Sequence, residues 1–331
     1  MKDAFLSRLS QFAARHAMWA SGKRILAAVS GGPDSLGLLL AMHEISETED
    51  FRLLCCVVNH HIRAEAASEA RFVSDVCRDI GVSCRIEEID VPAYRATHGG
   101  SLETVARNLR YEALRRAAKE ENCDVIATAH HKGDQAETVL YRILRGTGNR
   151  GLSGICPARG DLIRPFLCFT KEEISEFVKE YPYTPCHDAS NDVADTTRNK
   201  IRLELMPQLR RYNPAAEEAL CRMADSCRAD EEYLETEAAR FLTSVEKTGD
   251  GIRMDKEYFF RIPEALSYRV IRGLWLSADG RVPEAEEAAR IVRFLKHAET
   301  GKITSAAGVL VKAEKHSFLF APGDTRHYRK S

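Results

Sequence analysis

The chain has 331 residues, a length that suits two domains better than a single compact core. Its 44% hydrophobic and 29% charged residues are typical of a globular protein, and its formal net charge of −1 excludes the strongly basic balance of many nucleic-acid binders. No apolar stretch is long enough to cross a bilayer, and the N-terminus has charges throughout, unlike a secretory signal, so we expect no membrane association.

Strand-like and helix-like segments alternate in the first half of the chain. Helical patterns lie at 35–46, 65–80 and 101–121. Short β-rich runs lie at 24–29, 53–59, 84–89 and 125–129. This alternation predicts right-handed βαβ units, and therefore an α/β fold with a parallel sheet and helices on both faces. Ligands bind such sheets at the carboxyl ends of the strands.

A glycine turn directly follows the first predicted strand. Its residues are Ser30, Gly31, Gly32, Pro33, Asp34 and Ser35. A helix that begins near Asp34 aims its N–H groups and its positive dipole end at the turn, which therefore predicts a phosphate-binding loop. No lysine follows Gly32, which argues against a Walker-type loop, and no third glycine is spaced for a dinucleotide fingerprint.

The sequence pattern changes near Tyr212. A long acid-rich helix is predicted after Asn213-Pro214, to about residue 246, and further helices at 263–276 and 283–296. A hairpin is predicted around 302–304 and 309–320. We therefore expect two domains, 1–212 and 213–331, the second smaller and mainly helical.

The ordered set of motifs in the first domain resembles the tRNA(Ile)-lysidine synthases of the PP-loop ATP pyrophosphatase superfamily. The set comprises Ser-Gly-Gly-x-Asp-Ser at 30–35, Ala-Arg-x-x-Arg-Tyr at 106–111, His-His-x-x-Asp-Gln-Ala-Glu-Thr at 130–138, Arg-Gly-x-Gly-x-x-Gly-Leu at 145–152, Arg-Pro-Phe-Leu at 164–167, Asp-x-Ser-Asn at 188–191 and Arg-Asn-x-x-Arg at 198–202. The likeness spans about 24–214 in unbroken order. The last third resembles the family's small helical domain much more loosely.

The resemblance implies a cytoplasmic, ATP- and Mg²⁺-dependent ligase. Such enzymes join free L-lysine to C2 of the wobble cytidine in tRNA(Ile) with a CAU anticodon, through an adenylated cytidine, and release AMP and pyrophosphate. By motif match, Asp34, Arg110 and Asp134 form the catalytic set, the turn from Ser30 to Ser35 holds ATP, and Asp34 holds Mg²⁺. Residues 213–331 would bind tRNA.

The same resemblance and the local basic character yield a second group of candidates. The candidates for contacts with the substrate or the tRNA are His131, Glu137, Arg145, Arg150, Arg198 and Arg202. Many relatives carry two acids where this chain has Gly133 and Asp134, and we align Asp134 with the functional one.

Structural interpretations stay open beside these functional ones. Asp134 could only cap a helix. Arg110 could pair with Glu103 or Glu112, and charge clusters usually form solvated helix faces. His60-His61 and His130-His131 lack the spacing of a zinc site.

The ten cysteines are scattered without repeated spacing, so we expect reduced thiols in a cytoplasm. The adjacent pair Cys55-Cys56 lies in a predicted buried strand, and we interpret both side chains as packing residues. The absence of Cys-x-x-Cys argues against relatives that thiolate cytidine through an iron–sulfur cluster.

Two other functions remain as alternatives. The chain could be another PP-loop adenylating enzyme, of the tRNA thiolation or amidotransferase type, or a non-catalytic module that binds nucleotide or RNA. The helices after Tyr212 could bind tRNA or form a homodimer, and periodicity does not distinguish the two.

Overall fold

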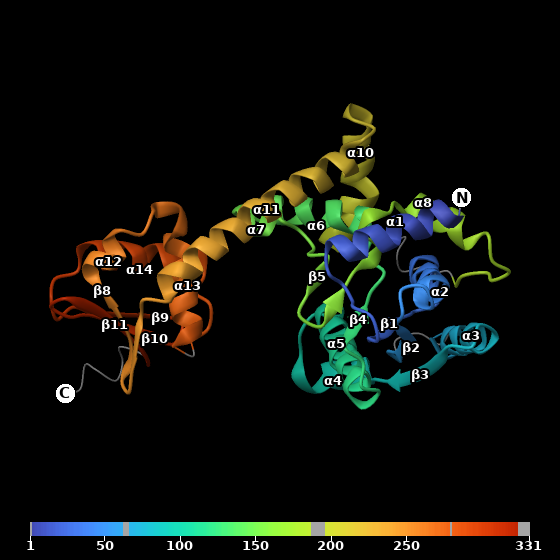
Figure 1. Cartoon of the computed structure of the whole chain (residues 1–331), viewed down its shortest axis with the longest axis horizontal. Coiled ribbons are helices and arrows are strands. Elements are labelled where there is room, and N and C mark those ends of the chain that lie inside the picture. Colours follow the sequence, from blue (N-terminus) through green and yellow to red (C-terminus); the bar gives the residue numbers. More distant parts are fainter. Residues whose placement is uncertain (1, 62–65, 187–195, 279, 324–331) are drawn as a thin grey trace. The chain divides into compact units, whose positions relative to one another are not determined.

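The computed structural model describes residues 2–61, 66–186, 196–278 and 280–323 (Figure 1). The chain divides into two compact units, Met1–Asp225 and Ser226–Ser331. The division falls inside one long helix, about a dozen residues after the boundary that the sequence predicts. None of the helices in the described ranges is long and apolar enough to cross a membrane.

The first unit is built on a six-stranded sheet with the strand order β3-β2-β1-β4-β6-β5. The strands are β1 (Arg24–Ala28), β2 (Arg52–Asn59), β3 (Ser83–Glu88), β4 (Val125–Ala127), β5 (Ala158–Arg159) and β6 (Leu162–Ile163). All neighbouring pairs are parallel except β5 and β6. The mostly parallel sheet predicted from the sequence is confirmed.

Helices cover both faces of this sheet (Figure 1). They are α1 (Lys2–Arg15), α2 (Pro33–Ser46), α3 (Ala66–Asp79), α4 (Val91–His98), α5 (Leu102–Glu120), α6 (Lys132–Leu144), α7 (Asn149–Leu152), the 3₁₀ turn η1 (Pro165–Cys168), α8 (Lys171–Val178), α9 (Thr197–Lys200), the π-helical turn η3 (Ile201–Leu205) and α10 (Met206–Tyr212). The helix α11 (Ala216–Leu242) follows.

Alternation along the strands explains the two covered faces. In β1, Ile25 and Ala27 join the core formed with α1, α2 and α3, whereas Leu26 joins the core formed with α5. Successive strand residues point to opposite faces, so a strand that is apolar throughout needs cover on both sides. The carboxyl ends of β1 and β4, which pair directly, carry the turns that lead into α2 and α6.

The second unit combines helices with a five-stranded antiparallel sheet of order β7-β8-β11-β10-β9. Its elements are β7 (Glu246–Thr248), β8 (Gly251–Asp255), α12 (Lys256–Phe260), α13 (Glu264–Ser277), α14 (Ala285–His297), β9 (Ile303–Ala306), β10 (Val309–Ala313) and β11 (Ser317–Pro322). The helices expected at 263–276 and 283–296 are present. The expected hairpin is wrong in its second arm, since 309–320 contains two antiparallel strands, β10 and β11, rather than one. The sequence reading missed β7 and β8, which extend the hairpin into a sheet.

Candidate functional site

The turn from Ser30 to Ser35 joins β1 to α2 and is held by its own serine. The backbone N–H of Ser30 donates to Oγ of Ser35 over 3.1 Å. The Ser35 hydroxyl in turn donates to the Gly32 carbonyl over 3.1 Å. Gly32 is the N-cap of α2 and has no side chain that could accept from the first-turn N–H groups. The N-terminus of α2 is thus arranged as an anion-binding site.

Gly31 needs to be a glycine for two reasons. Its φ of +86° lies in the left-handed region, and its neighbours leave little room for a side chain. Its carbonyl accepts a hydrogen bond of 2.9 Å from the Cys186 N–H. A Cβ at this position would lie 3.3 Å from Sγ of Cys186 and 3.5 Å from Cγ2 of Val73. The loop therefore packs against Val73 and Cys186, and the sequence did not predict either contact.

His131 lies between two carboxylates that come from neighbouring strand ends. It is the N-cap of α6. Its ring Nδ1 accepts from the Gly133 N–H at 3.0 Å, and its backbone N–H donates to Oδ2 of Asp134 at 3.1 Å. The other ring nitrogen of His131 faces the carboxylates of Asp34 and Asp134. This Nε2 lies 3.8 Å from Oδ2 of Asp34 and 3.7 Å from Oδ2 of Asp134.

Gly133 makes room for that histidine ring. A Cβ at position 133 would lie 2.8 Å from Cε1 of His131, so any side chain here would displace the ring. The glycine that departs from the pattern of many relatives therefore has a structural consequence in this chain: it lets His131 fold back over the start of α6.

Asp34 combines burial with an unpartnered oxygen. Burial raises the pKa of its carboxyl group, and the charges of His131 and Lys171 oppose this rise only in part. Its Oδ1 is buried and has no hydrogen-bond partner among the described residues. A hard cation such as Mg²⁺ prefers carboxylate oxygen, so this atom fits a metal ligand beside the phosphate loop.

Asp134 belongs to a four-membered charge network on α6, α9 and η3. Its Oδ1 accepts from Nη2 of Arg198 at 2.7 Å, while Glu137 accepts from Nε of Arg202 at 2.6 Å and from Nε of Arg198 at 3.1 Å. Burial opposes ionisation of Asp134, but His131, His130 and Arg198 outweigh it and lower its pKa to about 2. Asp134 is therefore both part of a helix cap and a permanently charged site group.

The network changes how two candidates are interpreted. Arg198 and Arg202 direct their guanidinium groups at Asp134 and Glu137, so they form ion pairs inside the site, and their contacts with substrate or tRNA stay predictions. Sequence spacing cannot show this, because the acids precede the arginines by about sixty residues.

Arg110 lies on α5 and is half-buried. Its Nε is buried without a hydrogen-bond partner, and among the described residues it forms no ion pair with Glu103 or Glu112. Arg164 is only 8% exposed and donates to the Cys156 carbonyl over 2.7 Å. Both arginines act electrostatically on His130, as does Asp134.

His130 is uncharged at neutral pH. Burial lowers its pKa to about 3, against the opposing effect of Asp134. Thus Arg110, Arg164 and Asp134 surround one neutral imidazole. The sequence reading did not single out Arg164, although its motif Arg-Pro-Phe-Leu offered a signal.

The other candidates lie outside this cluster or outside the described residues. Arg145 is exposed after α6 and donates to the Tyr141 hydroxyl at 3.0 Å, and Arg150 is exposed on α7. The predicted Asp-x-Ser-Asn turn at 188–191 lies outside the described residues. The tRNA contacts of Arg145 and Arg150 stay predictions.

Comparisons with known proteins agree with the geometry. Residues 1–209 match the family model described as the PP-loop domain. Similar proteins named tRNA(Ile)-lysidine synthase include that of Thermosipho africanus, 35% identical over 82% of this chain and 62% of its own length. Those of Clostridioides difficile (36%; 78% and 57%) and Geobacillus kaustophilus (32%; 90% and 65%) are comparable. The chain thus spans about three fifths of these relatives' length.

A solved structure shares the fold. The U34-tRNA thiolase NcsA from Methanococcus maripaludis with its [4Fe-4S] cluster matches with a TM-score of 0.55 and 16% identity, over 68% of this chain and 80% of that chain. At this identity the likeness concerns the fold alone.

Proposed function

The chain belongs to the PP-loop domain family, and we propose that it is an ATP-dependent ligase joining free L-lysine to C2 of the wobble cytidine in tRNA(Ile) with a CAU anticodon. One observation carries the proposal. Asp34 of the phosphate loop and Asp134 of the next strand end approach the same histidine nitrogen within 4 Å, as a two-step reaction at one centre requires.

The first step transfers AMP to the C2 oxygen of the cytidine, which turns a poor leaving group into a good one. The turn from Ser30 to Ser35 would hold the phosphates through backbone N–H groups. Mg²⁺, when held by Asp34, would neutralise charge on the departing pyrophosphate. Arg110 and Arg164, two guanidinium groups without carboxylate partners among the described residues, are suited to an anionic reactant.

The second step displaces AMP by the side-chain amine of lysine. Asp134 and Glu137 supply negative charge that would attract the lysine ammonium group, and Arg198 and Arg202 fix the position of both carboxylates. A carboxyl group whose pKa is lowered to about 2 is a weak base, so Asp134 orients the lysine, and the ammonium proton passes to solvent before the amine attacks C2 and AMP leaves.

The tRNA would contact more of the chain than this centre. Arg145 and Arg150 would bind backbone phosphates beside the site, and residues 213–331 would bind the tRNA body. The same segment could instead form a homodimer. We propose the tRNA role because the substrate cytidine has to be presented unstacked, which requires a grip on the surrounding RNA.

The test is an incubation of the purified protein with Mg·ATP, labelled lysine and two CAU-anticodon tRNAs, the minor isoleucine species and a methionine species. We expect label only in the isoleucine tRNA, with release of AMP and pyrophosphate. The matched variants are Arg110→Lys, which keeps the charge but not the forked geometry, and Arg78→Lys on the exposed face of α3.

Two other outcomes separate the alternatives. Cleavage of ATP without incorporation of lysine would favour a PP-loop enzyme that acts on another acceptor. Binding of ATP without any cleavage would favour a non-catalytic module.

A further inference from the structure

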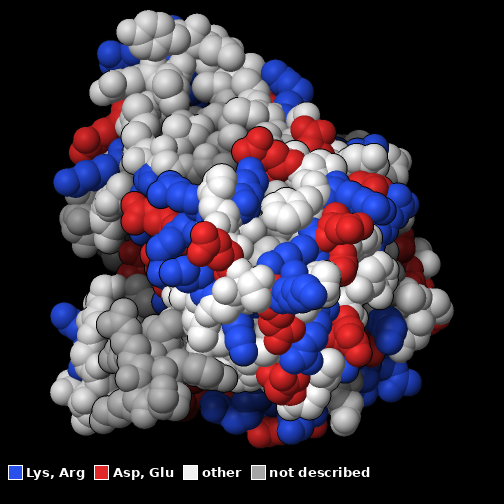
Figure 2. Space-filling model, turned by 90° about the vertical axis from the view of Figure 1, so that its left-hand side faces the viewer, with Lys and Arg blue, Asp and Glu red and all other residues white. Residues whose placement is uncertain are grey.

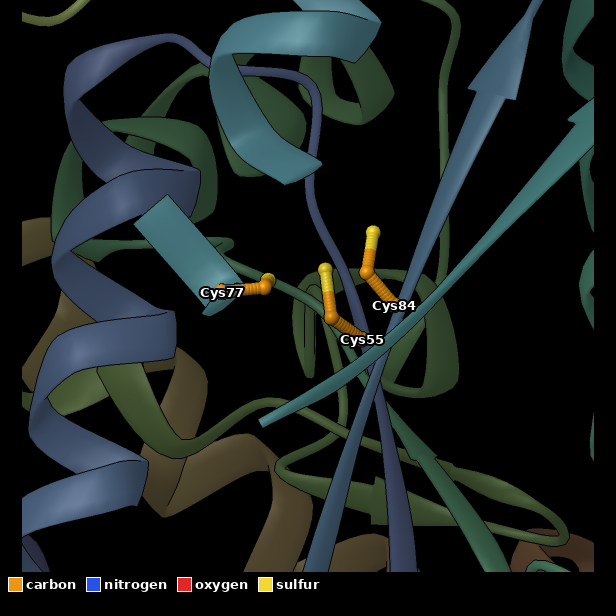
Figure 3. A group of neighbouring side chains, drawn as sticks. All are labelled: Cys55, Cys77 and Cys84. Atoms are coloured by element: carbon orange, nitrogen blue, oxygen red, sulfur yellow. The ribbon is translucent and has the colours of Figure 1, made fainter. Parts of the chain in front are cut away.

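Three cysteines from three elements come together on one face of the first unit's sheet. Cys55 lies on β2, Cys77 near the end of α3, and Cys84 on β3 (Figure 3). Cys55 and Cys84 are register partners on adjacent strands, and α3 places Cys77 above them. The three sulfur atoms all lie within 4.8 Å of one another.

The cluster lies in the apolar core, and only Cys84 is partly exposed to solvent. Cys55 and Cys77 are completely buried in the core with α1, α2 and α3, whereas Cys84 is partly exposed on the edge strand β3. All three are free thiols. The neighbouring Cys56 is also completely buried but joins the opposite core, beneath α5.

We propose that Cys55, Cys77 and Cys84 bind one soft metal ion through three sulfur atoms, with monovalent copper as the preferred ion. Metal–sulfur bonds of about 2.3 Å in a trigonal plane place the sulfurs about 4.0 Å apart. The present arrangement reaches this spacing if the side chains move inward by less than about 1 Å. Three sulfur ligands in a dry site favour monovalent copper over harder ions.

The number and spacing of the ligands disfavour two other metal groups. Structural zinc takes four ligands, and the described residues add no fourth His, Cys, Asp or Glu to the group. An iron–sulfur cube would need its cysteine ligands farther apart, because each sulfur would bind outward from a different iron. The site therefore fits a single ion.

Binding would proceed by exchange of protons for metal, without any change of oxidation state. Each thiol that becomes a ligand forms one copper–sulfur bond and releases its proton to solvent. Binding should strengthen as pH rises, because each ligand must lose its proton to bind the metal.

The bound ion would fasten α3 to the sheet next to the phosphate loop. Val73, one turn before Cys77 on α3, lies 3.5 Å from the position of a Cβ on Gly31. Metal bound to the folded state alone stabilises it by mass action. We therefore expect monovalent copper to raise the melting temperature of the first unit.

The test is an anaerobic titration with monovalent copper against bicinchoninate, a chromophoric chelator. The variant is Cys84→Ser, which changes the partly exposed member, and the matched control is Cys56→Ser, one residue from Cys55 on the other face. We expect the wild type and Cys56→Ser to take one ion per chain from the chelator and Cys84→Ser to lose at least a hundredfold in affinity.

X-ray absorption of the loaded wild type gives a readout that needs no variant. Three sulfur neighbours around each copper are expected. Equal binding by the wild type and Cys84→Ser, coordination by nitrogen or oxygen, or displacement of copper by equimolar Zn²⁺ would each overturn the proposal.

Discussion

Asp34 shows how a single residue can be costly to the fold and still be required. Its carboxyl group is buried, one oxygen accepts no hydrogen bond from the described residues, and burial raises its pKa above the ordinary 3.8. A folded-state pKa above the unfolded value means that ionisation destabilises the fold, and the penalty is complete once the pH exceeds the folded pKa.

The substitution Asp34→Asn should therefore stabilise the protein and abolish the reaction. At pH 7 the neutral amide removes the burial penalty, so the melting temperature measured by calorimetry should rise, while release of pyrophosphate from ATP should fall by at least a hundredfold. A lower melting temperature with retained pyrophosphate release would show that Asp34 is a structural residue.

Asp134 has the opposite electrostatic character. Burial opposes its ionisation, but the charges of His131 and Arg198 outweigh burial and hold its pKa at about 2, so its charge stabilises the folded state. The stabilisation is fully present above the unfolded value of 3.8 and is lost as the pH falls through about 2. A shift of this size corresponds to about 2 kcal/mol.

The substitution Asp134→Asn should cost about 2 kcal/mol of unfolding free energy at pH 7 and progressively less below pH about 4. Urea unfolding at a series of pH values measures the difference. Asp161→Asn is the matched control, because Asp161 pairs with Arg115 at the surface and such pairs contribute at most about 1 kcal/mol. A constant difference across the pH range would assign the effect to packing.

Motif recognition named Asp34 and Asp134 and also their partners His131 and Arg198, but it did not predict how these residues pair. A motif records residue types along the chain, whereas the positions of Arg198 over Asp134 and of His131 between two acids depend on tertiary packing. The clustering of Cys55, Cys77 and Cys84 was not predicted for the same reason, since their spacing along the chain follows no metal-binding pattern.

At the scale of elements, α2 links the core to the phosphate loop. It is apolar on all sides and buried, and Gly37 lets it approach α8 closely: a Cβ there would lie 3.0 Å from Cγ2 of both Ile174 and Val178. Because both neighbours are β-branched and stiff, they cannot easily make room.

The substitution Gly37→Ala should therefore destabilise the first unit. Overpacking costs about 1–3 kcal/mol, and the better helix propensity of alanine returns about 1 kcal/mol, which leaves a net loss of up to about 2 kcal/mol. Chemical denaturation measures the loss. Gly249→Ala, in a turn with no atom within 4 Å of the new Cβ, should change stability by less than about 0.5 kcal/mol.

Periodicity predicted β1 to β4 and the helices α2, α3 and α5 of the first unit, because these segments alternate with strong apolar patterns, but it missed the two-residue strands β5 and β6. It was less informative for β7 and β8, which are short and lie next to charged residues such as Glu246 and Asp255. The pairing of β8 with β11, more than sixty residues later, decides their strand structure, and no local pattern reports such a contact.

At the scale of the molecule, the two units have separate hydrophobic cores. One lies around β1, β2 and α2, and the other around Trp275 and Phe320. On the face drawn in Figure 2, basic and acidic side chains are interspersed, and neither sign forms a continuous patch. With a net charge of −1, binding of tRNA would depend on a few local contacts rather than on a general positive field.

Arg145 and Arg150 are the contacts for which this dependence can be measured. If each binds one phosphate, the logarithm of the tRNA association constant should fall with the logarithm of the salt concentration by about 0.7–0.9 per contact. The double variant Arg145→Ala/Arg150→Ala should then bind more weakly at low salt, with a slope shallower by about 1.4–1.8.

Filter binding at several salt concentrations gives both quantities, and Arg78→Ala, an exposed arginine on α3 paired with Asp75, is the control. The control should leave the slope unchanged. An unchanged slope in the double variant would remove Arg145 and Arg150 from the interface, whereas an equal change in the control would indicate general charge attraction. A shallower slope in the double variant alone would place the tRNA backbone beside the carboxyl end of α6.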